Sequence, residues 1–552
     1  GSEMCIRDSL TLAAAAPIVS SATLGPATLQ RWLSDGQEIA LLDVREHGQY
    51  GEGRPFFSVN MPYSRLEVEI GERVPRLATR IVLVDDGDAE GPSGVAWRAA
   101  QRLLALGYTQ VHVLDGGAKA WAETGHALFK GVNVPSKTFG ELIEHAHHTP
   151  SIGADELHRR LQSGEPLLLL DGRTLAEHRK MTIPGALPIP NGELAARIHS
   201  VLPDDTTPIV VHCAGRTRSI LGAQILIDLE LPNPIHALEN GTQGWRLAGL
   251  DLEHGSAREL PPLAPPSPAL SARRASARKR ALRHSAPLLT AQQAQAWLDD
   301  ADRTTYVLDV RTAAESVHQT LPGARHAPGG QLLQATDLVI GVRHSRVLLL
   351  DDDGEQGLRA PVIASWLSQL GYDTATVEHG IHAPLRVPPT AVLPPLPGLA
   401  RAQGELLTAR LSAPPTAASH ALVDLRGSLA YRKAHARGAR WGVRPRLTQA
   451  TGGAQVVTLI IDDEHIAQLA AIDLREQGIG DIAWTRPADL EAIGHPLEST
   501  PDQPADAEAI DYLFFVHDRH DGNLEAARRY LAWEIGLIAQ CQPQELAAFA
   551  LD

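Results

Sequence analysis

One short pattern, an apolar run that ends in Asp-x-Arg, occurs four times along the chain. The copies are ALLDVRE (40–46), LLLDGRT (168–174), YVLDVRT (306–312) and ALVDLRG (421–427). A second apolar run closes each copy, and these runs are RIVLVDD (80–86), PIVVHC (208–213), RVLLLDD (346–352) and TLIIDD (458–463). A pattern that returns at this scale predicts a chain built from four copies of one structural unit.

Each unit alternates strand-like and helix-like segments. Continuous apolar runs are typical of parallel strands buried on both faces, and amphipathic stretches such as VAWRAAQRLLALGY follow them. The predicted fold class is therefore α/β, with four tandem domains that are each a parallel sheet flanked by helices. We expect these domains to span residues 22–130, 150–255, 287–390 and 400–500.

Three segments lie outside the four units. Residues 1–21 begin with GSEMCIRDS, which resembles a cloning scar, and are expected to be a scar or flexible N-terminus. Residues 256–286 are rich in Pro, Ala and Arg, which predicts a solvated linker. Residues 505–552 contain an amphipathic pattern and predict a C-terminal helical extension that packs on the last domain or across a homodimer.

Composition restricts the setting and the partners. The formal net charge of −15 argues against general binding of nucleic acid or of an acidic membrane surface. No apolar run is long enough to cross a bilayer. Three cysteines give no disulfide framework, so the sequence predicts a reducing, cytoplasmic setting.

The second unit differs from the others where its second strand ends. Cys213 stands there, whereas the other copies have Asp85, Asp351 and Asp462. The loop CAGRTR (213–218) then leads into a helix, whose first N–H groups and positive end favour a thiolate. We expect Cys213 to be a nucleophile that receives an anion, helped by the charges of Arg216 and Arg218. The three units with Asp should be inert.

The simplest alternative is that Cys213 is a small core residue, since a lone buried cysteine usually is. The glycine, the two arginines and the helix start around it favour catalysis instead. His212 precedes the cysteine, but adjacent residues of a strand point to opposite faces, so we interpret it as a packing residue rather than a general base.

The Asp-x-Arg strand, the turn IPGALPIP (183–190) and the loop CAGRTR together resemble the rhodanese superfamily of persulfide-forming sulfurtransferases. The resemblance covers roughly residues 22–500 as four modules, of which one looks active. It implies that Cys213 is the nucleophile and that Asp171 and Arg173 brace the loop. The substrate-binding loop it implies consists of Ala214, Gly215, Arg216, Thr217 and Arg218.

The resemblance also implies a reaction. Cys213 would take the outer sulfur of thiosulfate, release sulfite, and pass the sulfur to a thiol, to cyanide or to a protein thiol. No metal and no cofactor would be required. Two alternatives stay within this chemistry: 3-mercaptopyruvate as the donor, or a regulatory or sulfur-relay scaffold that delivers persulfide to a partner enzyme.

A cysteine phosphatase is the alternative from another reaction class, because HCAGRTR also places a cysteine and an arginine over a helix. The phosphatase loop is one residue longer, and Ser219 occupies the position of its arginine. The shorter loop favours a single sulfur atom over a tetrahedral phosphate.

Overall fold

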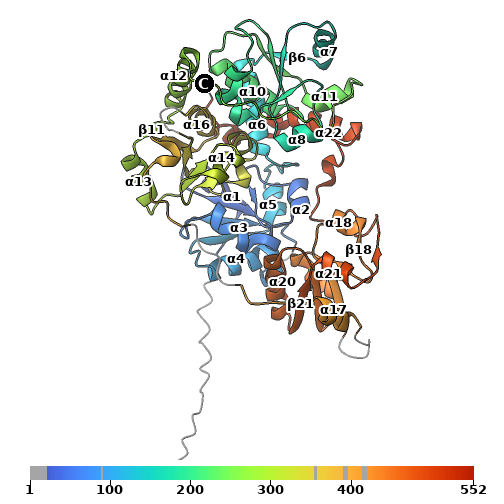
Figure 1. The fold of residues 1–552 in the computed structure, drawn as a ribbon. Helices are drawn as coiled ribbons and strands as arrows, with labels where there is room; N and C mark the ends of the chain where they lie inside the picture. The colour runs from blue at the N-terminus through green and yellow to red at the C-terminus, as the bar shows by residue number, and fades with distance from the viewer. Residues whose placement is uncertain (1–21, 89–90, 353–356, 390–395, 413–418, 552) are drawn as a thin grey trace, which may run out of the picture.

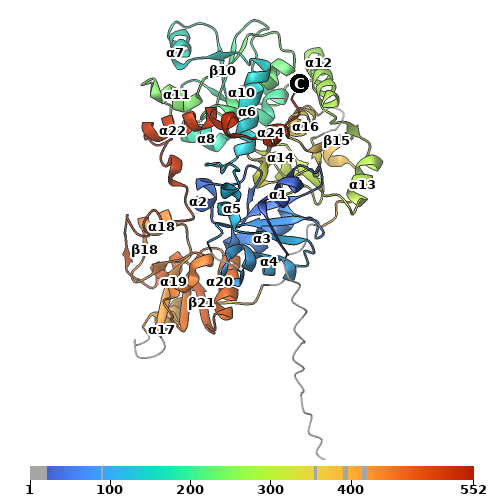
Figure 2. The ribbon, with the colours of Figure 1, turned by 180° about the vertical axis from the view of Figure 1, so that it is seen from behind.

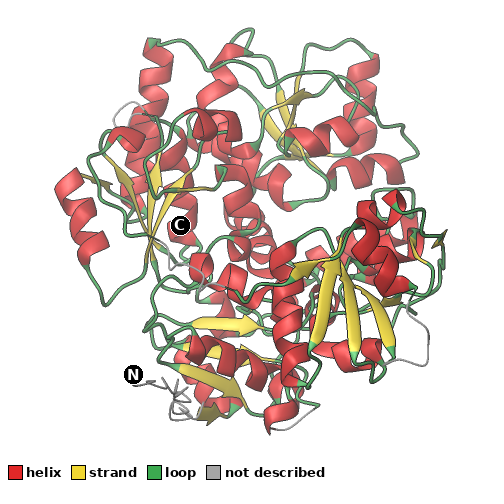
Figure 3. Ribbon diagram, turned by 60° about the horizontal axis from the view of Figure 1, so that its bottom comes forward, coloured by secondary structure: helices red, strands yellow, loops and turns green. Residues whose placement is uncertain are grey.

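The computed structural model describes residues 22–88, 91–352, 357–389, 396–412 and 419–551. It contains four sheets of five parallel strands, and each sheet has the same strand order. Figures 1 and 3 show the sheets enclosed by helices. This confirms the predicted α/β class with four parallel sheets. We call the four units modules 1 to 4 in chain order. The scar expected at residues 1–21 lies outside the described residues.

Module 1 shows the common topology, in which the sheet order is β1-β5-β4-β2-β3. The four residues of β2 and the four of β4 are all buried, which explains why these strands are apolar throughout. The strands are β1 (Ala22–Leu24), β2 (Ala40–Asp43), β3 (Val59–Asn60), β4 (Ile81–Val84) and β5 (Val111–Leu114). The helices are α1 (Pro26–Leu33), α2 (His47–Glu52), α3 (Leu66–Arg73), α4 (Val95–Ala105) and α5 (Gly117–Glu123).

Module 2 repeats this order and is preceded by a helix, α6 (Val134–His147), that packs against α10. Its strands are β6 (Ser151–Ile152), β7 (Leu168–Asp171), β8 (Leu187–Pro188), β9 (Ile209–His212) and β10 (Ile235–Leu238). Its helices are α7 (Ala154–Gln162), α8 (Leu175–Lys180), α9 (Leu194–Arg197), α10 (Thr217–Asp228) and α11 (Gly241–Leu247).

Modules 3 and 4 carry the same five-stranded arrangement. Module 3 consists of β11 (Leu288–Leu289), α13 (Ala291–Asp299), β12 (Thr305–Asp309), α14 (Ala313–His318), β13 (Arg325–His326), α15 (Gly329–Gln334), β14 (Arg346–Leu350), α16 (Arg359–Gln369) and β15 (Asp373–Val377). Module 4 consists of β16 (Ala400–Arg401), α17 (Gly404–Leu411), β17 (His420–Asp424), α18 (Ser428–Lys433), β19 (Arg440–Trp441), α19 (Leu447–Thr451), β20 (Val456–Ile460), α20 (Glu464–Glu476), β21 (Asp481–Thr485) and α21 (Pro487–Ala492). An additional antiparallel pair joins β18 (His435–Ala436) to β22 (Leu497–Glu498).

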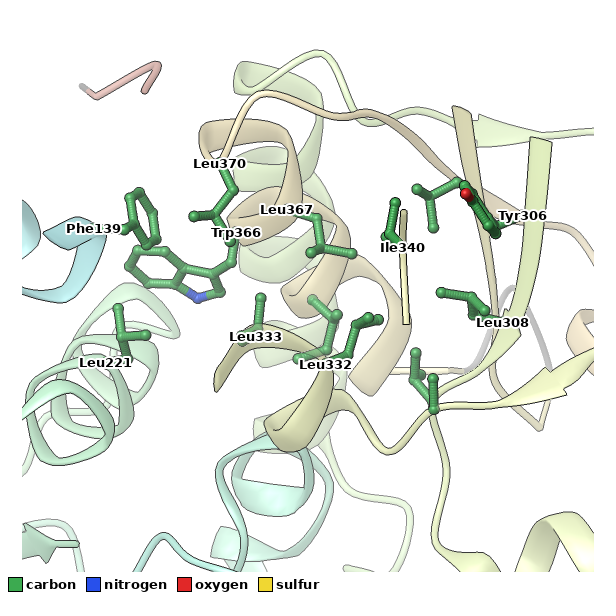
Figure 4. Packing of buried hydrophobic residues seen from close by; sticks show 14 of the residues in the cluster. Phe139, Leu221, Tyr306, Leu308, Leu332, Leu333, Ile340, Trp366, Leu367 and Leu370 are labelled. Carbon is green, nitrogen blue, oxygen red and sulfur yellow. The ribbon is translucent and has the colours of Figure 1, made fainter. Parts of the chain in front are cut away.

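One hydrophobic cluster runs through modules 1, 2 and 3. Figure 4 shows Trp366 of α16 facing Phe139 of α6, with Leu221 of α10 beside them, and the two aromatic ring centroids are 5.8 Å apart. Module 4 has separate apolar clusters. It contacts module 1 through charges: Arg444 pairs with Glu67 (2.6 Å), and Asp473 pairs with Arg102 (2.7 Å).

The expected solvated linker is wrong for residues 268–283. These residues form α12 (Pro268–Arg283), which packs on α16 and buries Leu270, Ala277 and Ala281. Ser267 caps the helix and proline fills its first position, both of which are ordinary start signals. The basic residues therefore belong to the polar face of a docked helix.

Only the start of the C-terminal extension packs on module 4, where Asp511 accepts from the N–H of Ser428 (2.8 Å) and Asp506 pairs with Arg432 (2.8 Å), so that expectation is wrong for the helices of the extension. Helices α22 (Leu524–Ile535) and α23 (Leu537–Gln540) pack against α6, and α22 also contacts α11 of module 2. A last helix, α24 (Pro543–Leu546), follows. Figures 1 and 2 both show the red α22 beside α8 and α11, far from the orange module 4. Among the described residues, no helix is long and apolar enough to cross a membrane.

Candidate active site

The end of β9 places Cys213 at one edge of the module 2 sheet. β7 and β9 pair in parallel, with Asp171 opposite His212 where both strands end. Cys213 follows directly and opens the short connection to α10. The carboxyl edge of a parallel sheet is where α/β folds generally place their ligand sites.

Asp171 and Arg173 form a buried ion pair of 2.7 Å beside this connection. Asp171 also accepts a hydrogen bond from Thr182 (2.9 Å), and Arg173 donates one to the carbonyl of Met181 (2.5 Å). The pair thus ties the end of β7 to the turn at 181–182. Its link to the cysteine loop runs through His212, whose Nε2 lies 3.7 Å from Asp171.

The His212 side chain is fully buried on the Asp171 side of the strand. Its Nε2 lies 3.3 Å from the Thr182 hydroxyl. Burial lowers the pKa of His212 to about 4, so the imidazole is neutral at neutral pH. The imidazole therefore lies in a buried polar network and does not line the cavity onto which Cys213 opens.

The loop after β9 encloses the thiol. Cys213 is 2% exposed, and the hydroxyl of Ser219, one turn into α10, donates to its Sγ at 3.1 Å. The carbonyls of Cys213 and Ala214 accept hydrogen bonds from the first residues of α11, Thr242 (2.8 Å) and Gln243 (3.1 Å). In the described part of the chain, the backbone N–H groups of residues 214–216 donate to no other group. The loop therefore keeps N–H donors available around a buried sulfur.

Two glycines allow this close packing. A Cβ on Gly241, which has a φ of +51°, would lie 2.3 Å from the carbonyl oxygen of Cys213. A Cβ on Gly215 would lie 3.0 Å from Oε2 of Glu534 and 3.1 Å from Cε1 of Tyr530. The cysteine loop is thus in contact with α11 on one side and with α22 on another.

Both loop arginines are paired with carboxylates. Arg216 donates to Glu141 (2.8 and 2.9 Å) and to Glu144, both on α6. Arg218 donates twice to Glu177 (2.9 and 2.7 Å). Burial alone would raise the pKa of Glu177, but Arg218 lowers it to about 2. The sequence predicted two positive charges beside Cys213. In the structure, three carboxylates pair with these two arginines.

Glu141, which accepts hydrogen bonds from Arg216, should make the stability of the folded protein depend on pH. Burial, opposed by Arg216, raises the pKa of Glu141 from 4.5 to about 7. The native state therefore holds a proton that the unfolded chain has released, and stability should fall as pH rises from about 5 to about 7, by at most about 1.4 kcal/mol per pH unit. Thermal unfolding midpoints across this range should decline for the native sequence and change less for Glu141→Gln. Parallel curves for the two proteins would contradict the assignment.

Cys213 opens into a cavity of about 300 Å³ that module 2 does not form alone. The segment 131–137, the third-module residues 331–338 and the C-terminal residues 513–534 complete its walls. Sequence reasoning missed the residues that these segments contribute, among them Lys137, Arg519, His520, Tyr530 and Glu534. The amphipathic pattern of the last segment was visible, but nothing in it indicated which module it would cover.

Glu534 joins α22 to the cysteine loop. Its carboxylate is 1% exposed and accepts a hydrogen bond from the hydroxyl of Thr217 (2.7 Å). Lys137 lies 3.7 Å from the same carboxylate and bonds the hydroxyl of Tyr530. The first residue of α10 is therefore held from a helix more than 300 positions away in the chain.

Comparisons with known proteins show which family has this arrangement. The profile of the rhodanese-like domain matches residues 25–124 and 153–248. The crystal structure of thiosulfate sulfurtransferase from Pseudomonas aeruginosa is 37% identical and has a TM-score of 0.86, over 96% of this chain and 99% of that one. The chain belongs to the rhodanese family.

Two further relatives match over lengths close to one rhodanese module. The HTH-type transcriptional regulator Rv0324 of Mycobacterium tuberculosis is 35% identical over 101 residues, or 18% of this chain and 43% of its own. YrkF of Bacillus subtilis is 28% identical over 125 residues, or 20% of this chain and 65% of its own. The chain thus spans less than two thirds of each of these relatives.

Two of the three rhodanese modules that lack the cysteine use an aspartate to bond the N–H groups of the same region. In module 1, Asp85 accepts from the backbone N–H of Gly87 (3.0 Å) and of Ala96 (3.0 Å). In module 3, Asp351 accepts from the N–H groups of Asp352 (2.9 Å) and Arg359 (2.8 Å). In these two modules a carboxylate of the chain itself occupies the donors that surround Cys213 in module 2.

Cys541 lies apart from the rhodanese cavity. It follows α23, where its thiol donates to the carbonyl of Leu537 at 3.3 Å. Burial raises its pKa to about 12, which keeps it a thiol at neutral pH. Cys541 does not line the Cys213 cavity.

Proposed function

We propose that this chain is a thiosulfate sulfurtransferase that carries sulfur as a persulfide on Cys213. The observation that carries the proposal is a free, buried thiol at a sheet edge, surrounded by unused N–H donors and open to a cavity. The near full-length likeness to a thiosulfate sulfurtransferase supports sulfurtransferase activity.

The first half-reaction loads the enzyme. The Cys213 thiolate attacks the outer sulfur of thiosulfate, a new S–S bond forms, and the S–S bond of thiosulfate breaks with its electron pair leaving on sulfite. The persulfide then carries a negative charge on its outer sulfur. The N–H groups of residues 214–216 are positioned to stabilise that charge, as preorganised donors do for other developing anions.

The second half-reaction empties the enzyme. A thiolate or cyanide attacks the outer sulfur, and Cys213 leaves as a thiolate whose sulfur is again within reach of the Ser219 hydroxyl. We place the cycle in a reducing compartment such as the cytoplasm, because the free thiol of Cys213 must stay unoxidised between turnovers.

The loop arginines take a structural part in this proposal. Arg218 pairs with Glu177, and in module 3, which lacks cysteine, Arg359 pairs with Glu315 at 2.8 Å in the same way. An ion pair that is present without the nucleophile supports a role in fixing the start of the helix. The sulfur charge would then rest mainly on backbone donors.

A single-turnover experiment tests the proposal. The protein is mixed with excess thiosulfate and no acceptor, sulfite is quantified, and peptides are examined by mass spectrometry. We expect about one sulfite per chain and one added sulfur atom on the Cys213 peptide, with none on Cys541. Loading by 3-mercaptopyruvate alone would replace the proposed donor, and loading only by a protein persulfide would favour a relay scaffold.

A further inference from the structure

Almost every charged side chain that lines the Cys213 cavity is matched by an opposite charge. Arg218 pairs with Glu177, Arg216 pairs with acids of α6, and Lys137 pairs with Glu534. His520 also lines the cavity, and burial together with the neighbouring Arg519 lowers its pKa to about 3, so it is neutral. The remaining charged residue of the lining is Arg519.

Arg519 has no carboxylate within ion-pair distance in the part of the chain that the structure describes. Its guanidinium lies over the ring of Tyr530, 4.3 Å from the centroid, and its Nε is buried without a hydrogen-bond acceptor. A half-buried cation with unused donors is costly unless an anion satisfies it. Its position in the lining makes the cavity the place where that anion would bind.

The transfer of sulfur requires a second anion position. When thiosulfate meets Cys213, the outer sulfur lies at the thiol and the loop donors, so the sulfonate end extends farther into the cavity. The three carboxylates of the loop region neutralise Arg216 and Arg218, which leaves these arginines poorly suited to hold a doubly charged donor.

Resting on the function proposed above, we propose that Arg519 binds the sulfonate group of the donor and the sulfite that leaves. The guanidinium presents several N–H donors in a plane and matches an oxyanion in two-pronged geometry. It gives up no proton and takes no electrons, so it acts by positioning the donor and by stabilising the charge that develops on sulfite.

Arg519 borders more than one cavity. Arg519 and His520 line a second cavity, of about 450 Å³, together with Thr242, Gln243 and Met181. The segment 519–520 therefore lines both the cysteine cavity and this second cavity. The C-terminal extension, which follows module 4, thus supplies the anion site of module 2.

A binding experiment tests the role of Arg519 separately from sulfur transfer. In the Cys213→Ser background, calorimetry would measure the affinity for sulfite and, separately, for thiosulfate. Arg519→Gln should weaken both by about 10- to 100-fold, and Arg519→Lys should lie between. The matched control is Arg528→Gln, an exposed arginine on α22 whose side chain is 60% accessible, and it should bind as the parent does.

Steady-state rates with the cysteine present supply the second readout. Arg519→Gln should raise KM for thiosulfate far more than it lowers kcat with cyanide. Unchanged sulfite affinity in Arg519→Gln, or an equal loss in Arg528→Gln, would overturn the assignment. If the native protein releases no sulfite from thiosulfate but sulfite binding still depends on Arg519, the proposed function fails and the anion site stands.

Discussion

Cys213→Ser should abolish sulfite release from thiosulfate, with a loss of roughly a thousand-fold or more when cyanide is the acceptor. A serine hydroxyl is protonated at neutral pH and cannot form a persulfide. The substitution changes one buried atom, and Ser219 can bond the new hydroxyl as it bonds the sulfur, so the fold should be kept. Sulfite release and the sulfur adduct on the Cys213 peptide would be measured together.

The matched control is Cys541→Ser, the other free cysteine of the described residues. Because Cys541 lies outside the cavity and burial keeps it protonated, this variant should retain turnover. Equal losses in the two variants would show that the second thiol participates. Substantial turnover in Cys213→Ser would remove the basis of the proposed function.

Asp171→Ala should destabilise module 2 by about 3–5 kcal/mol, because it leaves the Arg173 charge buried without its partner. The turn at 181–182 loses an acceptor for Thr182, and His212 loses the charge beside it. Amide hydrogen exchange, resolved by mass spectrometry, should show lost protection at residues 171–182, accompanied by a fall in sulfite release.

Module 4 offers a matched variant, since Asp424 and Arg426 form the same ion pair at 2.6 Å and Asp424 is fully buried. Asp424→Ala should loosen residues near 424–434 by a smaller free energy, because Arg426 is 19% accessible and Arg173 only 2%, and it should leave sulfite release intact. If Asp424→Ala removed activity as fully as Asp171→Ala, the brace would act on the whole chain and not on the cysteine module.

The repeated strands and the position of the cysteine could be predicted from sequence because both depend on local pattern. Continuous apolar runs are strands buried on two faces, and parallel pairing brings their carboxyl ends to one edge, which is where Asp171 and Cys213 lie. Asp85 and Asp351 were predicted to mark inert units from their alignment with Cys213, and the structure shows each bonded to backbone N–H groups.

Contacts between distant segments could not be predicted in this way. The acids that pair with Arg216 come from α6, about 75 positions earlier, and Glu534 lies 317 positions beyond Thr217. A helical pattern indicates that a segment has an apolar face but not what that face covers. For α12 the local start signal was present in Ser267 and Pro268, but the segment's richness in Pro, Ala and Arg favoured a solvated linker instead.

The aspartates at the strand ends of modules 1 and 3 distinguish these modules from module 2. In the proposed function, module 2 binds a transient negative charge, so its backbone donors must stay open until the persulfide forms. Asp85 and Asp351 carry that charge as part of the chain. The backbone donors of their modules are therefore satisfied without a ligand, which suits modules that act as walls and supports. An aspartate at this strand end thus builds into the polypeptide the kind of negative charge that we propose module 2 receives from its substrate.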